Sequence, residues 1–454
     1  MTTLLTDPDI RRTLRPAAVS LTQATWFWLR LGFISFGGPA GQIAIMHHEL
    51  VERRRWISEG RFLHALNFCM VLPGPEAQQL ATYIGWLMHR TRGALVAGGL
   101  FVLPSLCVLI ALSWIYLSFG QLPVVAGIFY GIKPAVTALV LHAAVRIGRR
   151  TLRSPWLWAL AAAAYAAMAW GQLSFVWILC VAALVGIIGA RWAPEVFALR
   201  AAAHASGADH APAIIDDDMP TPAHAHWSVR RMLRTLAVGI GLWAGALAAL
   251  VAWNGVHGLY VQMAWFFTKA ALLTFGGAYA VLPYVVQGAV EHAHWLSATQ
   301  MIDGLALGET TPGPLIMVVA FVGYLGGASA QAFGPQAVFW AGAAGAGVAT
   351  FFTFLPSFVF ILAGGPFIET THGDLRFTAP LTAITAAVVG VIVDLALFFA
   401  QHVFWPHGTA AAFDWPAAMI AAAAFLALMR FGRGVIEVVF ACGAIGLAWR
   451  LLGG

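Results

Sequence analysis

The sequence predicts an all-α, polytopic integral membrane protein built from two repeats, and three observations support this. Of its 454 residues, 60% are hydrophobic and only 10% are charged, whereas a soluble domain carries about 25% charged residues. Apolar runs of the length that a bilayer core requires, about 20 residues, recur along most of the chain. The two halves also share one pattern of motifs. These features exclude a soluble enzyme, a nucleic-acid-binding protein and a secreted disulfide-linked scaffold.

The repeat emerges when residues 36–75 are aligned with residues 275–314 at a constant offset of 239. Eleven of the forty aligned positions are identical, including a Phe-Gly-Gly triplet at the start and a Pro-Gly-Pro triplet at the end of each copy. Further on, Leu-Pro-Ser at 103–105 recurs at 355–357. An internal repeat of this kind predicts that both halves fold in the same way.

The first predicted element is a polar N-terminal tail, residues 1–21. It contains Arg11, Arg12 and Arg15, and no cleavage site follows a short apolar region as in a signal peptide. Arginine clusters mark the cytoplasmic loops of membrane proteins. The tail is therefore predicted to be cytoplasmic.

The first repeat, residues 22–192, begins with two interrupted segments, 22–45 and 62–89. Each is flanked by basic residues on both sides and has a Gly/Pro break near its middle. Irregular backbone at membrane depth is tolerated where it lines a cavity or is buried in protein, so each segment is predicted to be a re-entrant hairpin. The alternative, in which both segments cross fully, leaves the loop charges harder to explain. About four spanning helices follow, within residues 93–145 and 155–190.

The region between the repeats has two parts. Residues 193–232 are polar and rich in Ala, His, Pro and Asp, so they cannot bury a core and are predicted to form a flexible cytoplasmic linker. Residues 233–252 form one additional spanning helix. This extra crossing inverts all that follows, so residues 253–454 are predicted to be a second repeat of opposite orientation with a periplasmic C-terminus. Inverted repeats with broken helices are typical of secondary transporters.

The broken segments predict an anion-binding site. The N-terminal ends of helices carry partial positive charge and unpaired N–H groups, and glycine lets the backbone approach a ligand closely. Four such ends, two per repeat, would meet near the midplane of the membrane. The alternative is that small residues merely permit close helix packing. The backbone positions predicted to bind the substrate are Gly37, Gly38, Pro39, Pro73, Gly74, Pro75, Gly276, Gly277, Pro312, Gly313 and Pro314.

Two cations occupy the same position in the two repeats. Arg30 and Lys269 each precede the repeated phenylalanine by six residues. A charge within an apolar segment is costly and faces the protein interior or a pathway, so the two are predicted to balance the charge of a divalent oxyanion. The alternatives are snorkelling to the interface or an ion pair with Glu49 or Glu76.

Three acidic residues are predicted to couple transport to a proton or to balance charge: Glu76, Glu309 and Asp394. Buried carboxylates can carry protons when they are desolvated. Neutral polar side chains beside the breaks are predicted to contact the substrate, although hydrogen bonding to a neighbouring helix explains them equally well. These residues are Asn67, Gln78, Gln79, Thr310 and Thr311.

Motifs for catalysis are missing from the sequence. His47-His48-Glu49 lacks the spacing of a helical zinc protease, and no phosphate-binding loop or nucleotide fingerprint occurs. The four cysteines are isolated and suit neither a zinc site nor a disulfide framework. The protein is therefore predicted not to be an enzyme, to need no cofactor, and to be driven by an ion gradient or the membrane potential.

These motifs resemble those of the chromate ion transporters in their long, two-domain form. The resemblance rests on Phe-Gly-Gly-Pro at 36–39, Trp56, the stretch 73–79 with Gly85, and the second copies of both triplets. It covers residues 22–192 and 257–450. The resemblance implies export of chromate from the bacterial cytoplasm across the inner membrane, chromate resistance, and sulfate as a competitor.

The halves differ where Ala278 replaces Pro39 and Leu315 replaces Glu76, which predicts that they are not equivalent in function. The predicted mechanism is alternating access around a central site, and Arg30→Ala is expected to abolish resistance. The predicted partners are chromate, sulfate, membrane lipid and a second copy in a homodimer, without nucleic acid. The alternatives are an uptake carrier or channel for sulfate or another anion, and an intramembrane enzyme acting on a lipid phosphate.

Overall fold

The computed structural model describes residues 16–171, 173–192, 212–217, 219, 222, 224–370 and 378–453. In these residues the chain forms sixteen α-helices, and the only β-structure is an isolated bridge between Ile57 and Ile215. Six helices are long and apolar enough to cross a membrane. The prediction of an all-α polytopic membrane protein is confirmed. Most of the predicted N-terminal tail and much of the predicted linker lie outside the described residues.

The first half of the chain begins with short helices and continues with longer ones. Serine caps set three of the starts, since the hydroxyls of Ser20, Ser58 and Ser154 accept hydrogen bonds from backbone N–H groups in the first turn. The elements are α2 (Leu21–Ile34), α3 (Gly38–His47), the π-helical turn η2 (His48–Arg53), α4 (Glu59–Val71), α5 (Glu76–Phe119), α6 (Pro123–Thr151), α7 (Pro155–Ala169) and α8 (Phe175–Trp192).

The second half has the same order of elements after one additional helix, α10. Ser297 caps α13 as Ser58 caps α4, at the offset of 239, and both helices have 13 residues. The elements are α10 (Val229–Asn254), α11 (Leu259–Leu273), α12 (Ala278–Val285), η3 (Val286–His292), α13 (Ala298–Thr310), η4 (Leu315–Met317), α14 (Val318–Ser329), η5 (Pro335–Ala337), α15 (Val338–Thr370), α16 (Thr378–Phe404), α17 (Trp415–Met429) and α18 (Val435–Leu451).

Helix α5 is folded back on itself. Its backbone leaves the helical conformation at His89 and Arg90. On either side of this turn the chain packs very closely, since a Cβ on Gly85 would lie 2.4 Å from the carbonyl oxygen of Gly93. The 13-residue α4 is about 20 Å long at 1.5 Å per residue, and the first limb of α5 is similarly short. Neither could cross the roughly 30 Å hydrocarbon core alone. A re-entrant hairpin requires limbs that are this short.

The described part of the predicted linker differs from a flexible chain. The N–H of Ile215 donates to the carbonyl oxygen of Trp56 (3.0 Å), and the N–H of Ser58 donates to that of Ile215 (2.9 Å). The Ser58 hydroxyl donates to Asp217 Oδ1 (2.9 Å). The loop between η2 and α4 offers free backbone groups, so this segment is held by pairing rather than by a core of its own. Helix α10 also begins earlier than predicted, at Val229.

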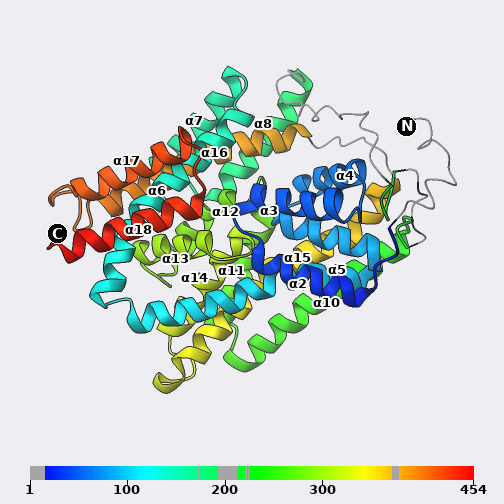
Figure 1. Cartoon of the computed structure of the whole chain (residues 1–454), viewed down its shortest axis with the longest axis horizontal. Helices are drawn as coiled ribbons and strands as arrows, with labels where there is room; N and C mark the ends of the chain where they lie inside the picture. The colour runs from blue at the N-terminus through cyan, green and yellow to red at the C-terminus, as the bar shows by residue number, and fades with distance from the viewer. Residues whose placement is uncertain are drawn as a thin grey trace.

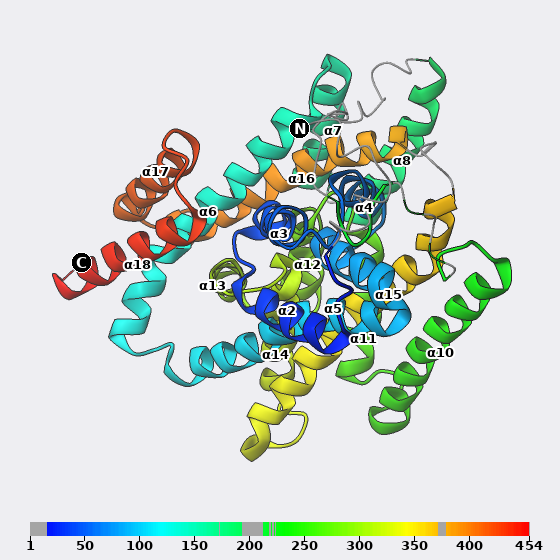
Figure 2. The ribbon, with the colours of Figure 1, turned by 45° about the vertical axis from the view of Figure 1, so that its right-hand side comes forward.

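The two halves are interleaved in space. Helix α5 packs against α2 and also against α15, and α16 packs against α6, α7 and α8. Figures 1 and 2 show α17 and α18 at one end of the molecule with α6, and α3 and α12 near its middle. Helix α10 lies on the outside against α15 and α11 and buries only Gly239. Such an exposed apolar helix suits a surface that faces lipid.

Candidate functional site

The two Pro-Gly-Pro loops join the halves through a pair of reciprocal hydrogen bonds. The N–H of Gly74 donates to the carbonyl oxygen of Thr274 (2.8 Å), and the N–H of Gly313 donates to that of Ser35 (2.8 Å). Ser35 and Thr274 directly precede the two Phe-Gly-Gly triplets and are equivalent at the offset of 239. Each Pro-Gly-Pro loop therefore lies against the Phe-Gly-Gly break of the other half.

Further contacts link these two pairs into one cluster. The side-chain amide of Gln42, in α3, donates to the carbonyl oxygen of Gly313. The hydroxyl of Tyr279, two residues after the second Phe-Gly-Gly break, donates to the carboxyl of Glu309, three residues before the second Pro-Gly-Pro. A carboxyl oxygen of Glu76 lies 3.9 Å from the position of a Cβ on Gly277. All four breaks thus meet in one region of the protein.

Two serine hydroxyls face the positive-φ glycines of this cluster. A Cβ on Gly74 would lie 2.5 Å from Ser357 Oγ, and a Cβ on Gly313 would lie 2.8 Å from Ser105 Oγ. Both serines are 1% exposed, and neither hydroxyl has a hydrogen-bond partner among the described residues. A buried polar group without a partner is costly and calls for a ligand or water. The sequence contained the signal, since both belong to the repeated Leu-Pro-Ser, but they were not predicted as site residues.

Three buried glutamine side chains come from the first half only. Gln78 Nε2 donates to Thr82 Oγ1 (3.0 Å), and Gln79 Nε2 donates to the carbonyl oxygen of Pro73 (2.8 Å). Each amide, including that of Gln42, keeps an oxygen without a partner in the described structure. The equivalent residues of the second half are apolar, namely Val281, Met317 and Val318. The cluster therefore has equivalent backbone contacts from both halves, but its buried side-chain amides come from the first half alone.

A cation on this side of the cluster is Arg146, which was not predicted as a site residue. It lies on α6 and acts electrostatically on both Glu309 and Tyr279. No ion pair to it is formed within the described part of the chain. Glu309 is 4% exposed. This side of the cluster therefore contains the buried carboxyl group of Glu309 and the guanidinium group of Arg146, which forms no ion pair with the described residues.

Arg30 and Lys269 lie elsewhere, and the prediction that they face the interior is wrong. Both side chains are exposed. Helix α2 buries the face that carries Ala24, Phe27 and Leu31, and helix α11 likewise buries the face opposite Lys269. The helical repeat of 3.6 residues therefore places both cations outside the buried faces of their helices.

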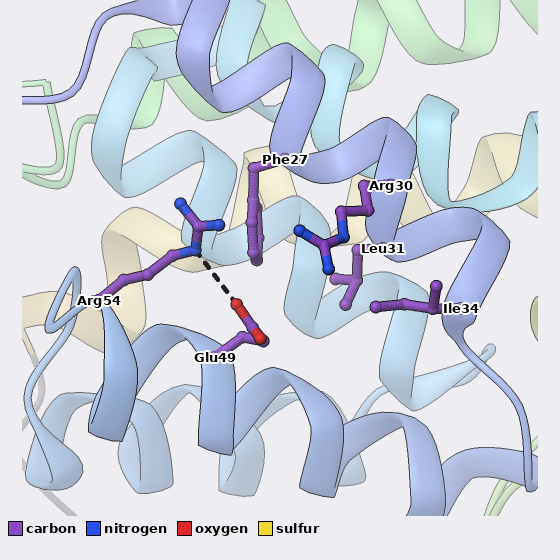
Figure 3. Close-up of a pocket in the computed structure, with 6 residues that line it drawn as sticks. All are labelled: Phe27, Arg30, Leu31, Ile34, Glu49 and Arg54. Carbon is purple, nitrogen blue, oxygen red and sulfur yellow. Dashed lines mark hydrogen bonds and ion pairs between the residues drawn. The ribbon is translucent and has the colours of Figure 1, made fainter.

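Arg30 instead lines a small pocket with Glu49 and Arg54 (Figure 3). Glu49 accepts hydrogen bonds from Arg53 (2.9 Å) and Arg54 (3.2 Å). Burial opposes ionisation of Glu49, but these bonds outweigh it, so its pKa lies below the ordinary value. The Glu49 carboxylate is thus committed to Arg53 and Arg54, and Arg30 is the remaining cation that lines this pocket.

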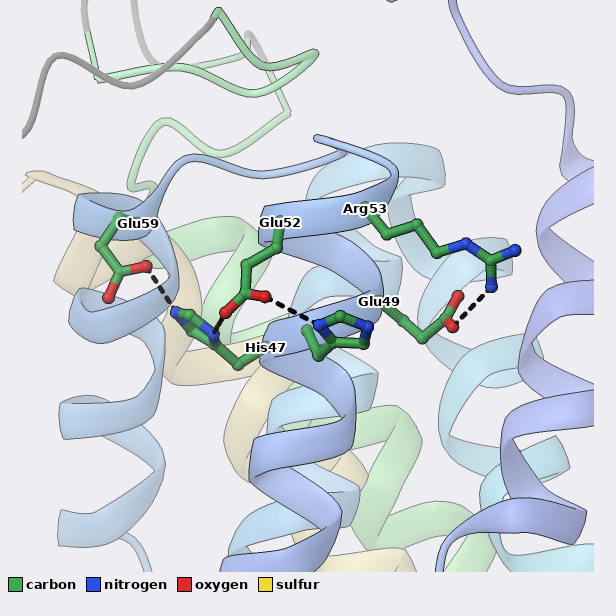
Figure 4. Close-up of polar contacts among 6 residues, drawn as sticks. His47, Glu49, Glu52, Arg53 and Glu59 are labelled. Carbon is green, nitrogen blue, oxygen red and sulfur yellow. Dashed lines mark hydrogen bonds and ion pairs between the residues drawn. The ribbon is translucent and has the colours of Figure 1, made fainter.

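A polar network fastens η2 to α4 beside this pocket (Figure 4). His47 lies between Glu59, at 2.5 Å from Nε2, and Glu52, at 3.2 Å from Nδ1. His48 also contacts Glu52, at 2.7 Å. The described residues contain no group of three side chains arranged to hold a metal ion. The network therefore stabilises the hairpin through hydrogen bonds between histidine and glutamate side chains.

The remaining predicted polar residues do not point into the cluster. Asn67 is exposed on α4. The hydroxyls of Thr310 and Thr311 donate to carbonyl oxygens of their own helix, those of Ala306 (2.9 Å) and Gly308 (3.4 Å). These bonds lie within α13 itself, whereas the alternative interpretation expected bonds to a neighbouring helix.

Asp394 also lies away from the breaks. It lines a separate cavity of about 690 Å³ with Glu291 and His292. Thr385, whose hydroxyl oxygen lies 3.5 Å from the position of a Cβ on Gly276, precedes Asp394 by nine residues on α16. This spacing corresponds to about 13 Å along the helix.

Comparison with known proteins places the chain in a family. The model of the family described as "Chromate transporter" matches residues 22–187 and 261–447. The chain is 33% identical to a chromate transport protein of Pseudomonas aeruginosa over 438 residues, covering 95% of this chain and 93% of that one. It is 29% identical to the chromate transport protein of Cupriavidus metallidurans over 439 residues, covering 95% and 94%. No solved structure matches. The chain therefore belongs to the chromate transporter family, whose members are membrane transport proteins rather than enzymes.

Proposed function

We propose that this protein exports chromate from the bacterial cytoplasm across the inner membrane and so confers chromate resistance. It acts as a secondary transporter by alternating access around the cluster where the four breaks meet. The observation that carries this proposal is the pair of buried serine hydroxyls without partners, Ser105 and Ser357, held against the two Pro-Gly-Pro loops. Chromate as the substrate comes from the relatives, which are named for chromate transport.

The chemistry of the cluster suits a tetrahedral dianion. Helix α3 begins at the last glycine of a break, and α5, α12 and the turn η4 begin directly after one. Their N-terminal N–H groups and partial positive charge favour an anion. The two serine hydroxyls add donors, and Arg146 supplies a full positive charge. Glu76 and Glu309 would repel a dianion when ionised, so their protonation affects its binding.

Transport of radiolabelled chromate into everted membrane vesicles tests this function. Export in the cell corresponds to uptake into such vesicles, so uptake that an uncoupler abolishes is expected. Excess sulfate should reduce uptake if the site recognises tetrahedral dianions generally. Vesicles containing confirmed protein but showing no more uptake than control vesicles would contradict chromate export. Uptake only into right-side-out vesicles would favour the alternative of an anion uptake carrier.

Arg146 and Arg30 make a matched test of the site. Arg146→Ala removes the cation beside Glu309, and the loss of a charged hydrogen-bond donor costs about 1.5–3 kcal/mol, so KM for chromate is expected to rise about ten- to hundredfold. Arg30→Ala is expected to leave transport near the wild-type level because its side chain is exposed outside the cluster. Initial rates in everted vesicles measure both. Strongly impaired transport in Arg30→Ala with unchanged KM in Arg146→Ala would reverse the assignment.

A further inference from the structure

Two triads, each of a buried acid, a cation and a tyrosine, join the halves away from the central cluster. In the first, the Arg61 latch, Glu369 accepts one hydrogen bond from Arg61 (2.5 Å) and another from the hydroxyl of Tyr83. Arg61 belongs to α4 of the first half and Glu369 to α15 of the second. Glu369 is 3% exposed, and each of its carboxyl oxygens has a partner.

The second triad, the Asp303 latch, has the same parts, with the acid again from the second half and the cation and tyrosine from the first. Asp303, on α13 of the second half, accepts a hydrogen bond from the hydroxyl of Tyr116 (2.8 Å) and lies 3.7 Å from Lys133 Nζ. Both partners belong to the first half, on α5 and α6. Asp303 is 2% exposed, and its Oδ1 has no partner among the described residues. The carboxyl group of this latch therefore has one oxygen without a partner, whereas both oxygens of Glu369 have one.

The latches lie on either side of the central cluster. Because α5 folds back at His89, Tyr83 on its first limb is level with about residue 95 on the second limb. Tyr116 lies about 20 residues further along that limb, so the latches are about 30 Å apart, roughly the thickness of the hydrocarbon core. Ser105 lies about midway between them.

Each latch holds the helix that leads into a Pro-Gly-Pro loop. Arg61 lies on α4, which ends shortly before the loop at 73–75, and Asp303 lies on α13, which ends shortly before the loop at 312–314. The Arg61 latch is also on the side of the arginine-rich loop after η2, and Arg61 donates to the carbonyl oxygen of Met219 in the linker (3.0 Å). The positive-inside rule assigns this side to the cytoplasm.

From this placement we infer that the two latches are the gates of the transporter. The Arg61 latch closes the cytoplasmic side and the Asp303 latch closes the periplasmic side. Breaking a latch releases its helix, α4 or α13, from the other half of the protein. Water can then reach Ser105 from that side of the membrane. This inference rests on the proposed alternating access, and it assigns six positioning residues that do not contact the substrate.

Thiol labelling of a cysteine at the central site tests the gates. The reporter is Ser105→Cys in a background with Cys69, Cys107, Cys180 and Cys442 replaced by serine, treated with a charged, membrane-impermeant methanethiosulfonate. Glu369→Gln is expected to speed labelling from the cytoplasmic face, and Asp303→Asn from the periplasmic face, each about tenfold, by shifting the balance of the two states. Glu437→Gln, in the exposed pair Arg433–Glu437, is the control and should change neither rate.

Milder variants keep the test valid if a charge variant fails to fold. Tyr83→Phe and Tyr116→Phe each remove one hydrogen bond and should shift labelling in the same two directions, more weakly. Unchanged rates in folded variants, or a shift to the same face for both latches, would overturn the inference. Labelling does not depend on chromate, so wild-type vesicles that fail to take up chromate would contradict the proposed function without affecting this result.

Discussion

Replacing Gly74 by alanine is expected to reduce chromate transport about a hundredfold. Gly74 has a φ of +127°, a conformation that costs an L-residue about 1–3 kcal/mol. The added Cβ would also lie 2.5 Å from Ser357 Oγ and 2.6 Å from Gln79 Nε2, and such overpacking costs about 1–3 kcal/mol. Together these effects displace the loop that meets the opposite half, and a loss of about 3 kcal/mol corresponds to a hundredfold change in rate.

Matched variants separate this effect from a general sensitivity to alanine. Gly313→Ala should have a similar effect, because Gly313 has a φ of +110° and its Cβ would lie 2.5 Å from Ser105 Cβ. Gly99→Ala should transport normally, since a Cβ there meets nothing within 4 Å. The measurement is the initial rate of chromate uptake into everted vesicles at equal protein. Transport by Gly74→Ala at the rate of Gly99→Ala would contradict the proposed role of the loop.

Arg61→Ala is expected to cause the largest loss of stability of any single ion-pair substitution in the described structure. Glu369 would remain buried as an unpaired carboxylate, and removing one partner of a buried pair costs about 3–5 kcal/mol. The side chains of Arg61 and Glu369 are only 15% and 2% exposed, and they lie 2.5 Å apart. Thermal unfolding of the purified protein, followed by loss of the monodisperse peak, measures the effect.

A double variant and a surface control sharpen this test. Arg61→Ala combined with Glu369→Gln should recover much of the lost stability, because no unpaired charge is left inside the protein. Arg433→Ala should cost at most about 1 kcal/mol, since exposed ion pairs contribute little and both partners are 67% exposed. Equal melting temperatures for Arg61→Ala and Arg433→Ala would show that the buried pair does not hold α4 in place.

The candidate site was only partly predictable. The repeated triplets identified the backbone of the cluster because Gly and Pro act locally, through φ angles and missing N–H groups. The cations Arg30 and Lys269 were assigned wrongly because their helices are apolar on nearly all faces, so periodicity does not show which face is buried. Arg146 was missed for a related reason: a basic residue near a helix end indicates topology, not which helix lies opposite.

The sequence by itself determined that the chain is an all-α membrane protein, that its halves repeat, and where its helices break. These properties depend on composition and on short motifs, which act within a few residues. Only the tertiary structure decided which polar groups meet, as when Ser105 faces Gly313 and Arg61 pairs with Glu369, 308 residues away. Such contacts depend on how whole helices pack, and in an apolar chain packing is set by shape summed over many side chains.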